Sequence, residues 1–333
     1  MIGGANPVDT LMRLSGAQCV SRALHVVADL GIADALGDTP LSVDTLANAT
    51  GTHADALERV LRLLAGYGIF AIHNGAFVHT PASELLRSDH PHSMRSLVRM
   101  MGLPIYWRMW EAFDLTVRTG VAAAAEVLPE GSWKYLADHP DEARIFDEAM
   151  TEKSHAQIPA ILRSYDFSRF TRIADIGGGH GHLLRAVLTA TPSTTGVLFD
   201  VAHVIQAAAQ SAADRLVFGA GDFFRDPLPS CDCYVVMHVL HDWNDSDATK
   251  ILRAIHRAAR PEATVLVLES IVPDDPHPSW ERILDMHMMA IHAGRERTRG
   301  QFADLLGTAG FHVLREIDTQ AGVWILEALP VAN

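Results

Sequence analysis

Cysteine is scarce in this chain. Its 333 residues include only three cysteines, Cys19, Cys231 and Cys233. Three thiols cannot build a disulfide framework, and Cys231-Asp-Cys233 lacks the further ligands that a zinc site requires. The cysteines therefore predict reduced thiols in an intracellular protein, and we expect a cytoplasmic location.

Long apolar runs and basic clusters are also missing from the sequence. No stretch approaches the roughly 20 apolar residues that span a bilayer, and the first residues show no basic region followed by a hydrophobic run. The 27 lysines and arginines are outnumbered by 40 aspartates and glutamates, which gives a formal net charge of -13. So acidic a chain repels phosphate groups, and we expect neither a nucleic acid nor a membrane as partner.

Apolar residues, by contrast, make up 48% of the chain, enough for a large core. The length favours two domains, and residues 1–100 predict a mostly helical first one. Within it, a short helix ends at Gly51, Thr52–Asp55 resembles a capping box for a second helix over 56–66, and a β-hairpin turns at Asn74-Gly75. This winged-helix pattern carries few basic residues, which favours a structural or dimer-forming role over DNA binding.

Residues 101–165 are expected to form a helical linker that contributes to a substrate pocket. Methionine and aromatic residues are frequent there, among them Trp110, Phe146 and Met150. Such side chains either build a core or mould around a flat ligand.

Residues 166–333 alternate strand-like apolar runs with amphipathic helices. We expect strands at 173–176, 196–199, 216–218, 233–239, 264–268, 311–316 and 323–328, and helices at 183–189, 203–213, 247–259 and 299–309. This alternation predicts a Rossmann-like, doubly wound α/β sheet, in which ligands bind at the carboxyl ends of the strands.

The glycine-rich loop after the first of these strands is the most informative motif. Glycines at 177, 179 and 181 let a ligand approach the backbone closely. The loop is not the dinucleotide fingerprint, which would need a glycine where His182 stands. Asp175 followed by alternate glycines (Gly177, Gly179, Gly181) instead matches the loop that binds S-adenosylmethionine, and the Asp175 carboxylate would suit its ammonium group.

Acidic residues at the next two strand ends support the same cofactor. Asp200 ends the second strand, where a carboxylate can accept hydrogen bonds from ribose hydroxyls. Asp222, in Gly221-Asp-Phe-Phe224, follows the third strand and can accept from the adenine amino group, with Phe223 packing on the ring.

His241 directly follows the fourth strand and is the candidate general base. Deprotonating a phenol, with a reference pKa of about 10, requires a positioned base that titrates near neutrality. Glu269, at the end of the fifth strand, and Glu296 are the candidates to hold its other ring nitrogen. A metal site of His238, His241 and Asp242 is the alternative. Residues 238 and 241 of a strand point to opposite faces, so joint ligation requires the chain to turn between them, and we expect no metal.

The sequence resembles the plant-type small-molecule O-methyltransferases, the caffeic acid and flavonoid group, especially their bacterial relatives in natural-product pathways. The resemblance covers nearly the whole chain and rests on Asp175–Gly181, Leu198–Asp200, Gly221–Phe224, Val239–Trp243, Glu269 and Gly294–Thr298. It implies an N-terminal winged-helix dimerisation domain, a C-terminal Rossmann-like domain and hence a homodimer.

The resemblance also implies roles for individual residues. His241 would be the general base, flanked by Glu269 and Glu296, while Asp242 would help to position the accepting ring. The implied cofactor contacts are Ser154, Gly177, Asp200, Asp222 and Phe223, and the implied pocket residues are Phe146, Met150, Asp285, Met288, Met289 and His292. Plant members carry a lysine where Met237 stands, so their cofactor contact does not carry over to that position.

Together these observations predict an S-adenosylmethionine-dependent O-methyltransferase that acts on a small, aromatic molecule. Methylation at carbon or nitrogen is an alternative, and so is a repurposed family member that runs hydroxylase or pericyclase chemistry. The retained His241 and its acidic neighbours argue against repurposing. The acidic balance argues against a third alternative, a DNA-binding regulator.

Overall fold

The computed structural model describes residues 6–211 and 214–331. The chain divides into two units: one comprises Met1–Arg108 and Ser132–Lys153, the other Met109–Gly131 and Ser154–Asn333. Among the described residues, no helix combines the length and the apolar character that crossing a membrane requires.

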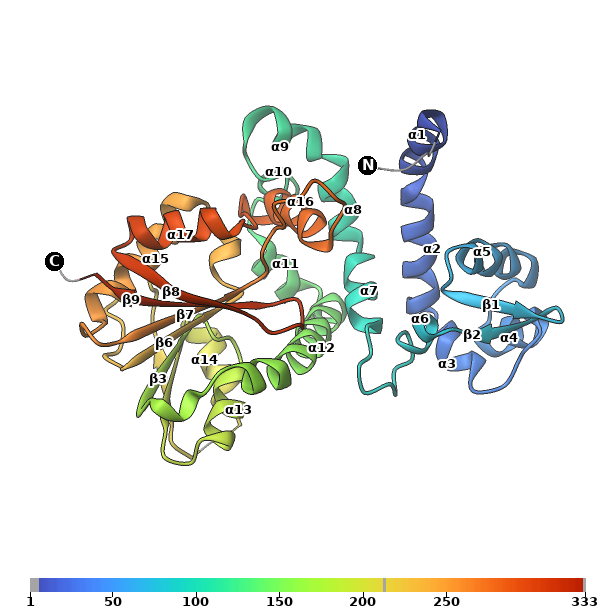
Figure 1. The fold of residues 1–333 in the computed structure, drawn as a ribbon. Helices are drawn as coiled ribbons and strands as arrows, with labels where there is room; N and C mark the ends of the chain where they lie inside the picture. The colour runs from blue at the N-terminus through green and yellow to red at the C-terminus, as the bar shows by residue number, and fades with distance from the viewer. Residues whose placement is uncertain (1–5, 212–213, 332–333) are drawn as a thin grey trace. The chain divides into compact units, whose positions relative to one another are not determined.

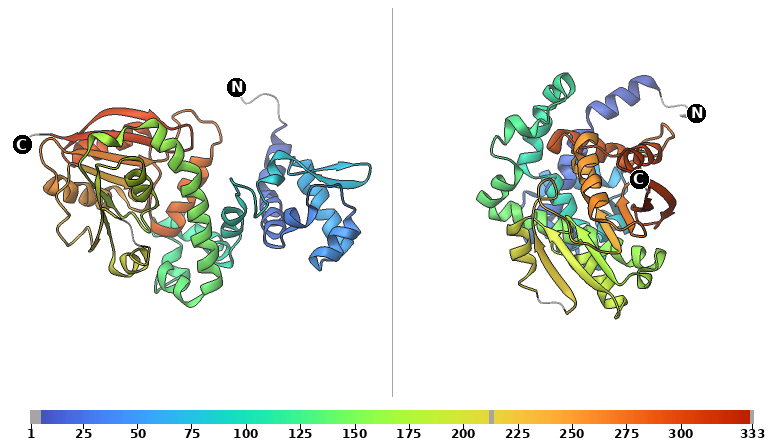
Figure 2. Two further views of the ribbon diagram at one scale, coloured as in Figure 1. Left: turned by 90° about the horizontal axis from the view of Figure 1, so that it is seen from below. Right: turned by 90° about the vertical axis from the view of Figure 1, so that its left-hand side faces the viewer.

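The first unit has the expected winged-helix arrangement. Its elements begin with α1 (Pro7–Ser15), α2 (Ala17–Asp29), α3 (Ile32–Leu36), α4 (Val43–Thr50), α5 (Ala54–Gly66), β1 (Phe70–His73) and β2 (Ala76–His79). Leu46 of α4, Leu61 of α5 and Phe70 and Phe77 of the hairpin share one buried core. The hairpin therefore packs beside α4 and α5, as the left view of Figure 2 shows.

Local signals explain where these elements begin and end. Ser42 caps α4, because its hydroxyl accepts from the backbone N–H of Thr45. The hairpin turns where Asn74 and Gly75 both adopt positive φ, which is the geometry of a two-residue turn. The capping box expected at Thr52–Asp55 is wrong: α5 begins at Ala54, and the ring of His53 caps it.

The prediction of a mainly helical segment over 101–165 is correct. It is occupied by α8 (Pro104–Glu111), α9 (Phe113–Thr119), α10 (Ala124–Val127), α11 (Ser132–Asp138) and α12 (Pro140–Ser164), and the shorter α6 (Pro81–Glu84) and α7 (Arg95–Met101) precede it. Gly120 ends α9 in the left-handed conformation.

The second unit is built around a seven-stranded sheet with the order β5-β4-β3-β6-β7-β9-β8. The strands are β3 (Arg172–Ile176), β4 (Thr195–Asp200), β5 (Leu216–Ala220), β6 (Cys233–Met237), β7 (Thr264–Glu269), β8 (Phe311–Asp318) and β9 (Trp324–Pro330). The pairs from β5 to β7 are parallel, whereas β9 pairs antiparallel with both β7 and β8. Chain order reverses between β3 and β6, which is where ligands bind in such sheets.

Helices cover both faces of this sheet (Figure 1). They are α13 (His182–Ala190), α14 (Ala202–Ala208), α15 (Asp245–Ala258) and α17 (Arg299–Thr308), whereas α16 (Trp280–His292) contacts α9 and α10. Neighbouring strand residues point to opposite faces: Ile173 packs in the core with α13 and α14, and Ala174 in the core with α15 and α17. The predicted doubly wound fold is therefore confirmed.

The ends of β6 and α14 fall two or more residues short of the sequence-based expectation. β6 ends at Met237 rather than Val239, because the backbone of His238 turns to a φ of 52°. α14 ends at Ala208, short of the predicted 213, and residues 212 and 213 lie outside the described residues.

Candidate functional site

The glycine loop that follows β3 has no space for a side chain at Gly177 or Gly178. Gly177 has a φ of 70°, and a Cβ atom there would lie 2.8 Å from Cγ2 of Val239. Its N–H donates to the carbonyl of Phe199 in β4. Gly179 and Gly181 also have positive φ, so the loop requires glycine at the predicted positions.

Asp175 lies beneath this loop and is buried. A Cβ atom at Gly178 would lie 2.5 Å from Cγ of Asp175. Burial, and then the nearby charge of Asp200, raise the pKa of Asp175 to about 7. A cation bound beside this carboxylate would stabilise its charged form, and the sequence predicts the ammonium group of S-adenosylmethionine for that place.

Asp200 connects the end of β4 to the glycine loop. Its Oδ2 accepts from the N–H of Gly179 at 2.9 Å, and its Oδ1 accepts from the N–H of Val201 at 2.7 Å. Its backbone carbonyl accepts from the N–H of Gly221. Gly221 is itself packed tightly, since a Cβ atom there would lie 2.6 Å from the ring of Phe199. The three strand ends are thus linked by hydrogen bonds.

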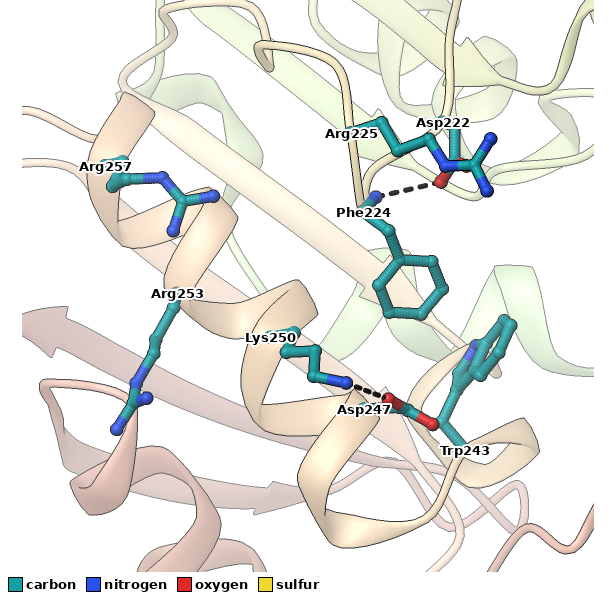
Figure 3. Close-up of a pocket in the computed structure, with 8 residues that line it drawn as sticks. All are labelled: Asp222, Phe224, Arg225, Trp243, Asp247, Lys250, Arg253 and Arg257. Atoms are coloured by element: carbon teal, nitrogen blue, oxygen red, sulfur yellow. Dashed lines mark hydrogen bonds and ion pairs between the residues drawn. The ribbon is translucent and has the colours of Figure 1, made fainter.

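Asp222 forms a turn with Phe224, whose N–H donates to Oδ1 of Asp222 at 2.9 Å. Phe223, Phe224 and Trp243 pack edge to face. Figure 3 shows that Asp222 and Phe224 also line a surface groove of about 660 Å³, together with Arg225, Trp243, Asp247, Lys250, Arg253 and Arg257. His241 does not line this groove, so the groove is not the catalytic pocket.

The turn after β6 carries His241 into the interior. Leu240–Asp242 form a single turn of 3-10 helix, and His241 has 6% of its surface exposed. The chain does turn between residues 238 and 241, which joint ligation of a metal would require: β6 has ended at Met237, and the two rings lie 5.6 Å apart. The side chain of His238 is held by Gln157, 2.8 Å from its Nε2.

Glu296 holds the ring of His241. Its Oε1 lies 2.6 Å from Nδ1 of His241, within the buried interior. In the neutral ring this contact places the proton on Nδ1 and leaves Nε2 as the acceptor. Nε2 lies 3.5 Å from Oδ1 of Asp242. His241 therefore has the arrangement of a general base with one oriented nitrogen and one reactive nitrogen.

Glu269 acts on the backbone of the turn rather than on the ring. Its Oε1 accepts from the N–H groups of Val239 and Leu240 at 3.0 and 2.8 Å. Its Oε2 lies 3.9 Å from Nδ1 of His241, beyond hydrogen-bond distance. Of the two expected orienters, Glu296 is therefore the one that bonds the ring, and Glu269 holds the turn.

The acidic neighbours change the pKa of His241. Burial alone would lower it, but Glu269, Asp242 and Glu296 outweigh burial and raise the pKa to about 9. A pKa of about 9 keeps the ring mostly protonated at neutral pH.

Two residues of the Gly294–Thr298 motif make contacts that the sequence did not predict. A Cβ atom at Gly294 would lie 2.2 Å from the carbonyl oxygen of His241, and the N–H of Arg295 donates to that same oxygen at 2.8 Å. The segment that supplies Glu296 therefore also contacts the backbone of His241. No local pattern could reveal this, because the partners are far apart in the sequence.

The predicted pocket residues divide between the two units. Four of them lie on α16 in the second unit: Asp285, Met288, Met289 and His292. Trp110 lies at the end of α8, in the part that belongs to the second unit, and its ring is 6.3 Å from that of His287. Oδ1 of Asp285 accepts from the N–H of Glu296. Phe146 and Met150 lie on the part of α12 that belongs to the first unit, and Ser154 on the part that belongs to the second.

One group of side chains in the described residues has the composition of a metal site. Ligand atoms of His238, His241 and Glu269 lie within 4.8 Å of one another. Glu296 already contacts Nδ1 of His241, so a metal bound through that atom would have to displace this hydrogen bond.

Two family models match this chain. Residues 12–89 match the O-methyltransferase dimerisation domain, and residues 111–312 match the O-methyltransferase domain. A phenazine O-methyltransferase from Lysobacter antibioticus is 37% identical, over 98% of either chain. An 8-amino-8-demethylriboflavin N,N-dimethyltransferase from Streptomyces davaonensis is 39% identical, over 92% of this chain and 90% of the relative.

The fold has close counterparts among solved structures. The crystal structure of a methyltransferase in calicheamicin biosynthesis, with S-adenosylhomocysteine bound, is similar with a TM-score of 0.88. The two sequences are 30% identical, and the match covers 98% of this chain and 100% of the other.

Proposed function

The chain belongs to the O-methyltransferase family and depends on S-adenosylmethionine, and on this premise we propose that His241 is the base that deprotonates an aromatic hydroxyl group for methylation. The proposal rests on one contact above all. Glu296 holds Nδ1 of His241 at 2.6 Å and leaves Nε2 to accept the proton.

S-adenosylmethionine supplies an electrophilic methyl group attached to a positively charged sulfur. The work of the chain is to take the hydroxyl proton on Nε2 of His241, hold the oxygen in line and exclude water. The carboxylates of Glu296 and Glu269 stabilise the imidazolium that results. A base with a pKa of about 9 is well matched to a phenol, whose reference pKa is about 10.

For the cofactor we propose contacts along the carboxyl ends of β3, β4 and β5. The buried carboxylate of Asp175 would bind the ammonium group, Asp200 the ribose hydroxyls and Asp222 the adenine amino group. Phe223 would pack on the adenine, and Ser154 would contact the carboxylate. Gly177, Gly179 and Gly221 would let the cofactor approach the backbone, which the lack of space for side chains at Gly177 and Gly221 supports.

For the substrate we propose a small aromatic molecule, bound against α16. Asp242 would position the ring, and residues of the second unit would line the pocket: Trp110, Asp285, Met288, Met289 and His292. A second candidate is methylation of an aromatic amine, which the similarity to an N,N-dimethyltransferase favours. The same base can serve both acceptors.

We also propose that the chain forms a homodimer through its first unit. Leu11, Met12 and Leu14 of α1 each leave more than half of their surface exposed, and the dimerisation domain match covers this helix in part. Burying such residues against a second copy would stabilise the assembly. On α5, Arg62 is paired with Glu58, so the winged helix is proposed to serve dimerisation and not nucleic acid binding.

The proposed division of labour follows from these roles. Residues 1–100 would dimerise, 101–165 would contribute to the substrate pocket, and 166–333 would bind the cofactor. We propose a cytoplasmic location, which the free thiols of Cys231 and Cys233 in the protein interior support.

The experiment that tests the proposal is a methyl-transfer assay with S-adenosylmethionine and matched acceptors. Pairs of phenols and anilines on the same ring system would be incubated with the protein, and mass spectrometry would locate the added methyl group. We expect methylation on oxygen. Methylation confined to nitrogen would favour the second candidate, and binding without transfer to any acceptor would contradict both.

A further inference from the structure

Arg297 is fully buried although its side chain carries a positive charge. A guanidinium group has five N–H donors, and burying it is costly unless they are bonded. Four hydrogen bonds satisfy the group here: Nε donates to Oδ1 of Asp245 (2.9 Å), and backbone carbonyls accept from Nη1 and Nη2, those of Leu240 (2.9 Å), Arg295 (3.2 Å) and Trp243 (2.8 Å). Nη2 also lies 2.9 Å from Oδ1 of Asp245, which completes an ion pair.

Two of these carbonyls lie on either side of His241 and Asp242 in the sequence, at the two ends of the turn that carries His241. Leu240 immediately precedes His241, and Trp243 immediately follows Asp242. The Nη1 and Nη2 atoms of one rigid, planar group therefore fix the spacing between the two ends of the turn. A lysine ammonium, as a point charge on a flexible stem, cannot reproduce this fork.

Arg297 is also anchored on the side away from the turn. Its carbonyl accepts from the N–H of Val272 at 3.0 Å, and it forms a β-bridge with Ile271, just after the strand that supplies Glu269. Its guanidinium lies 5.9 Å from the centre of the Phe302 ring in α17. The fork therefore ties the turn of His241 to the sheet and to a packed helix.

We propose that Arg297 is a positioning residue for methyl transfer, which acts by holding the His241 turn against Glu296. This inference rests on the proposed role of His241 as general base. Arg297 makes no contact with the glycine loop or with the acidic residues of the proposed cofactor site among the described residues. Its influence is therefore directed at the base and not at cofactor binding.

The test compares Arg297→Lys with Arg299→Lys, the same change at a half-exposed arginine two positions along, which pairs with Glu316. A displacement of about 1 Å at a catalytic group can lower the rate about 100-fold, and we expect a loss of about that size in kcat for Arg297→Lys. The affinity for S-adenosylhomocysteine, measured by calorimetry, should not change. Arg299→Lys should behave as the unaltered protein.

The pH profile separates positioning from general damage. A relaxed turn moves His241 away from its carboxylates, so the midpoint of the acid limb should fall from about 9 towards 6.5, the ordinary value for histidine. If Arg297→Lys binds S-adenosylhomocysteine normally and retains both the rate and the midpoint, the proposal is overturned.

A second variant keeps the test decisive if Arg297→Lys does not fold. Asp245→Asn removes the charge partner on the exposed side and leaves Arg297 in place. We expect a smaller loss of kcat and a shift of the midpoint in the same direction, and an unchanged profile would overturn the proposal. Failure of the proposed function would look different, because His241→Ala would then keep a normal rate.

Discussion

Oε1 of Glu296 lies 2.6 Å from Nδ1 of His241, and both side chains are buried. The two residues are 55 positions apart in the sequence. The N–H of Arg295 and the close approach of Gly294 bring the same two segments together through the backbone. The base and its orienting carboxylate are therefore fixed relative to each other by several independent contacts.

Removing the negative charge of Glu296 should shift the pH profile of the reaction rate. Glu269, Asp242 and Glu296 raise the pKa of His241 against the effect of burial. His241 is active as a base only when it is deprotonated. The value of kcat/KM should therefore rise with pH to a plateau, and the midpoint of this rise should lie at about pH 9. In Glu296→Gln we expect that midpoint at lower pH and a reduced plateau. A rate profile that keeps its midpoint would show that Glu296 does not set the pKa of the base.

Asp200 should be important for cofactor affinity. Its carboxylate already orders the glycine loop through the N–H of Gly179, and hydrogen bonds to charged groups contribute about 1.5–3 kcal/mol each. Asp200→Ala should therefore weaken S-adenosylhomocysteine binding by about 10-fold to 100-fold in calorimetry. Asp304→Ala, at an exposed position of α17, is the matched control. Equal affinities of the two variants would remove Asp200 from the proposed cofactor site.

Gly294 should not tolerate even one added carbon. A Cβ atom there would lie 2.2 Å from the carbonyl oxygen of His241, so the two segments would have to separate. We expect Gly294→Ala to lower both the melting temperature and kcat. At Gly307, within α17, a Cβ atom meets nothing within 4 Å, and alanine is the better helix former. Gly307→Ala should thus melt at the same or a higher temperature. A harmless Gly294→Ala would mean that the close approach does not constrain the turn.

The charge on His241 should also contribute to stability in a defined pH range. Its pKa is about 9 in the folded protein against a reference value of 6.5. The stabilisation is therefore fully present below about pH 6.5 and is lost as the pH rises through 9. The melting temperature of the cofactor-free protein should exceed that of His241→Asn most at low pH, and the difference should shrink between pH 7 and pH 10. A difference independent of pH would contradict the raised pKa.

The sequence predicts those parts of the site that depend on local motifs. Asp175, Asp200 and Asp222 lie at or near the ends of strands that are recognisable by their apolar runs, and Gly177, Gly179 and Gly181 stand where the backbone takes positive φ. His241 could be located near the ligand end of the sheet for the same reason. Because β3, β4, β5 and β6 are parallel, their carboxyl ends lie at the same edge of the sheet.

Other features depend on contacts that no local pattern reveals. His238 adopts a positive φ, which favours glycine or asparagine. The apolar run therefore predicts a strand that continues to Val239, whereas β6 ends at Met237. The cap of α5 is His53, a residue type not usually expected at that position. The choice of Glu296 over Glu269 as the ring's partner depends on distances between distant segments, which spacing along the chain cannot supply.

The account depends most directly on His241 as the base. The decisive measurement is kcat of His241→Ala with a phenol of high pKa, on protein whose affinity for S-adenosylhomocysteine is shown to be unchanged. We expect a loss of about 10²-fold to 10⁴-fold, the usual contribution of general base catalysis. A rate within a few-fold of the unaltered protein would contradict the mechanism and require another group to take the proton.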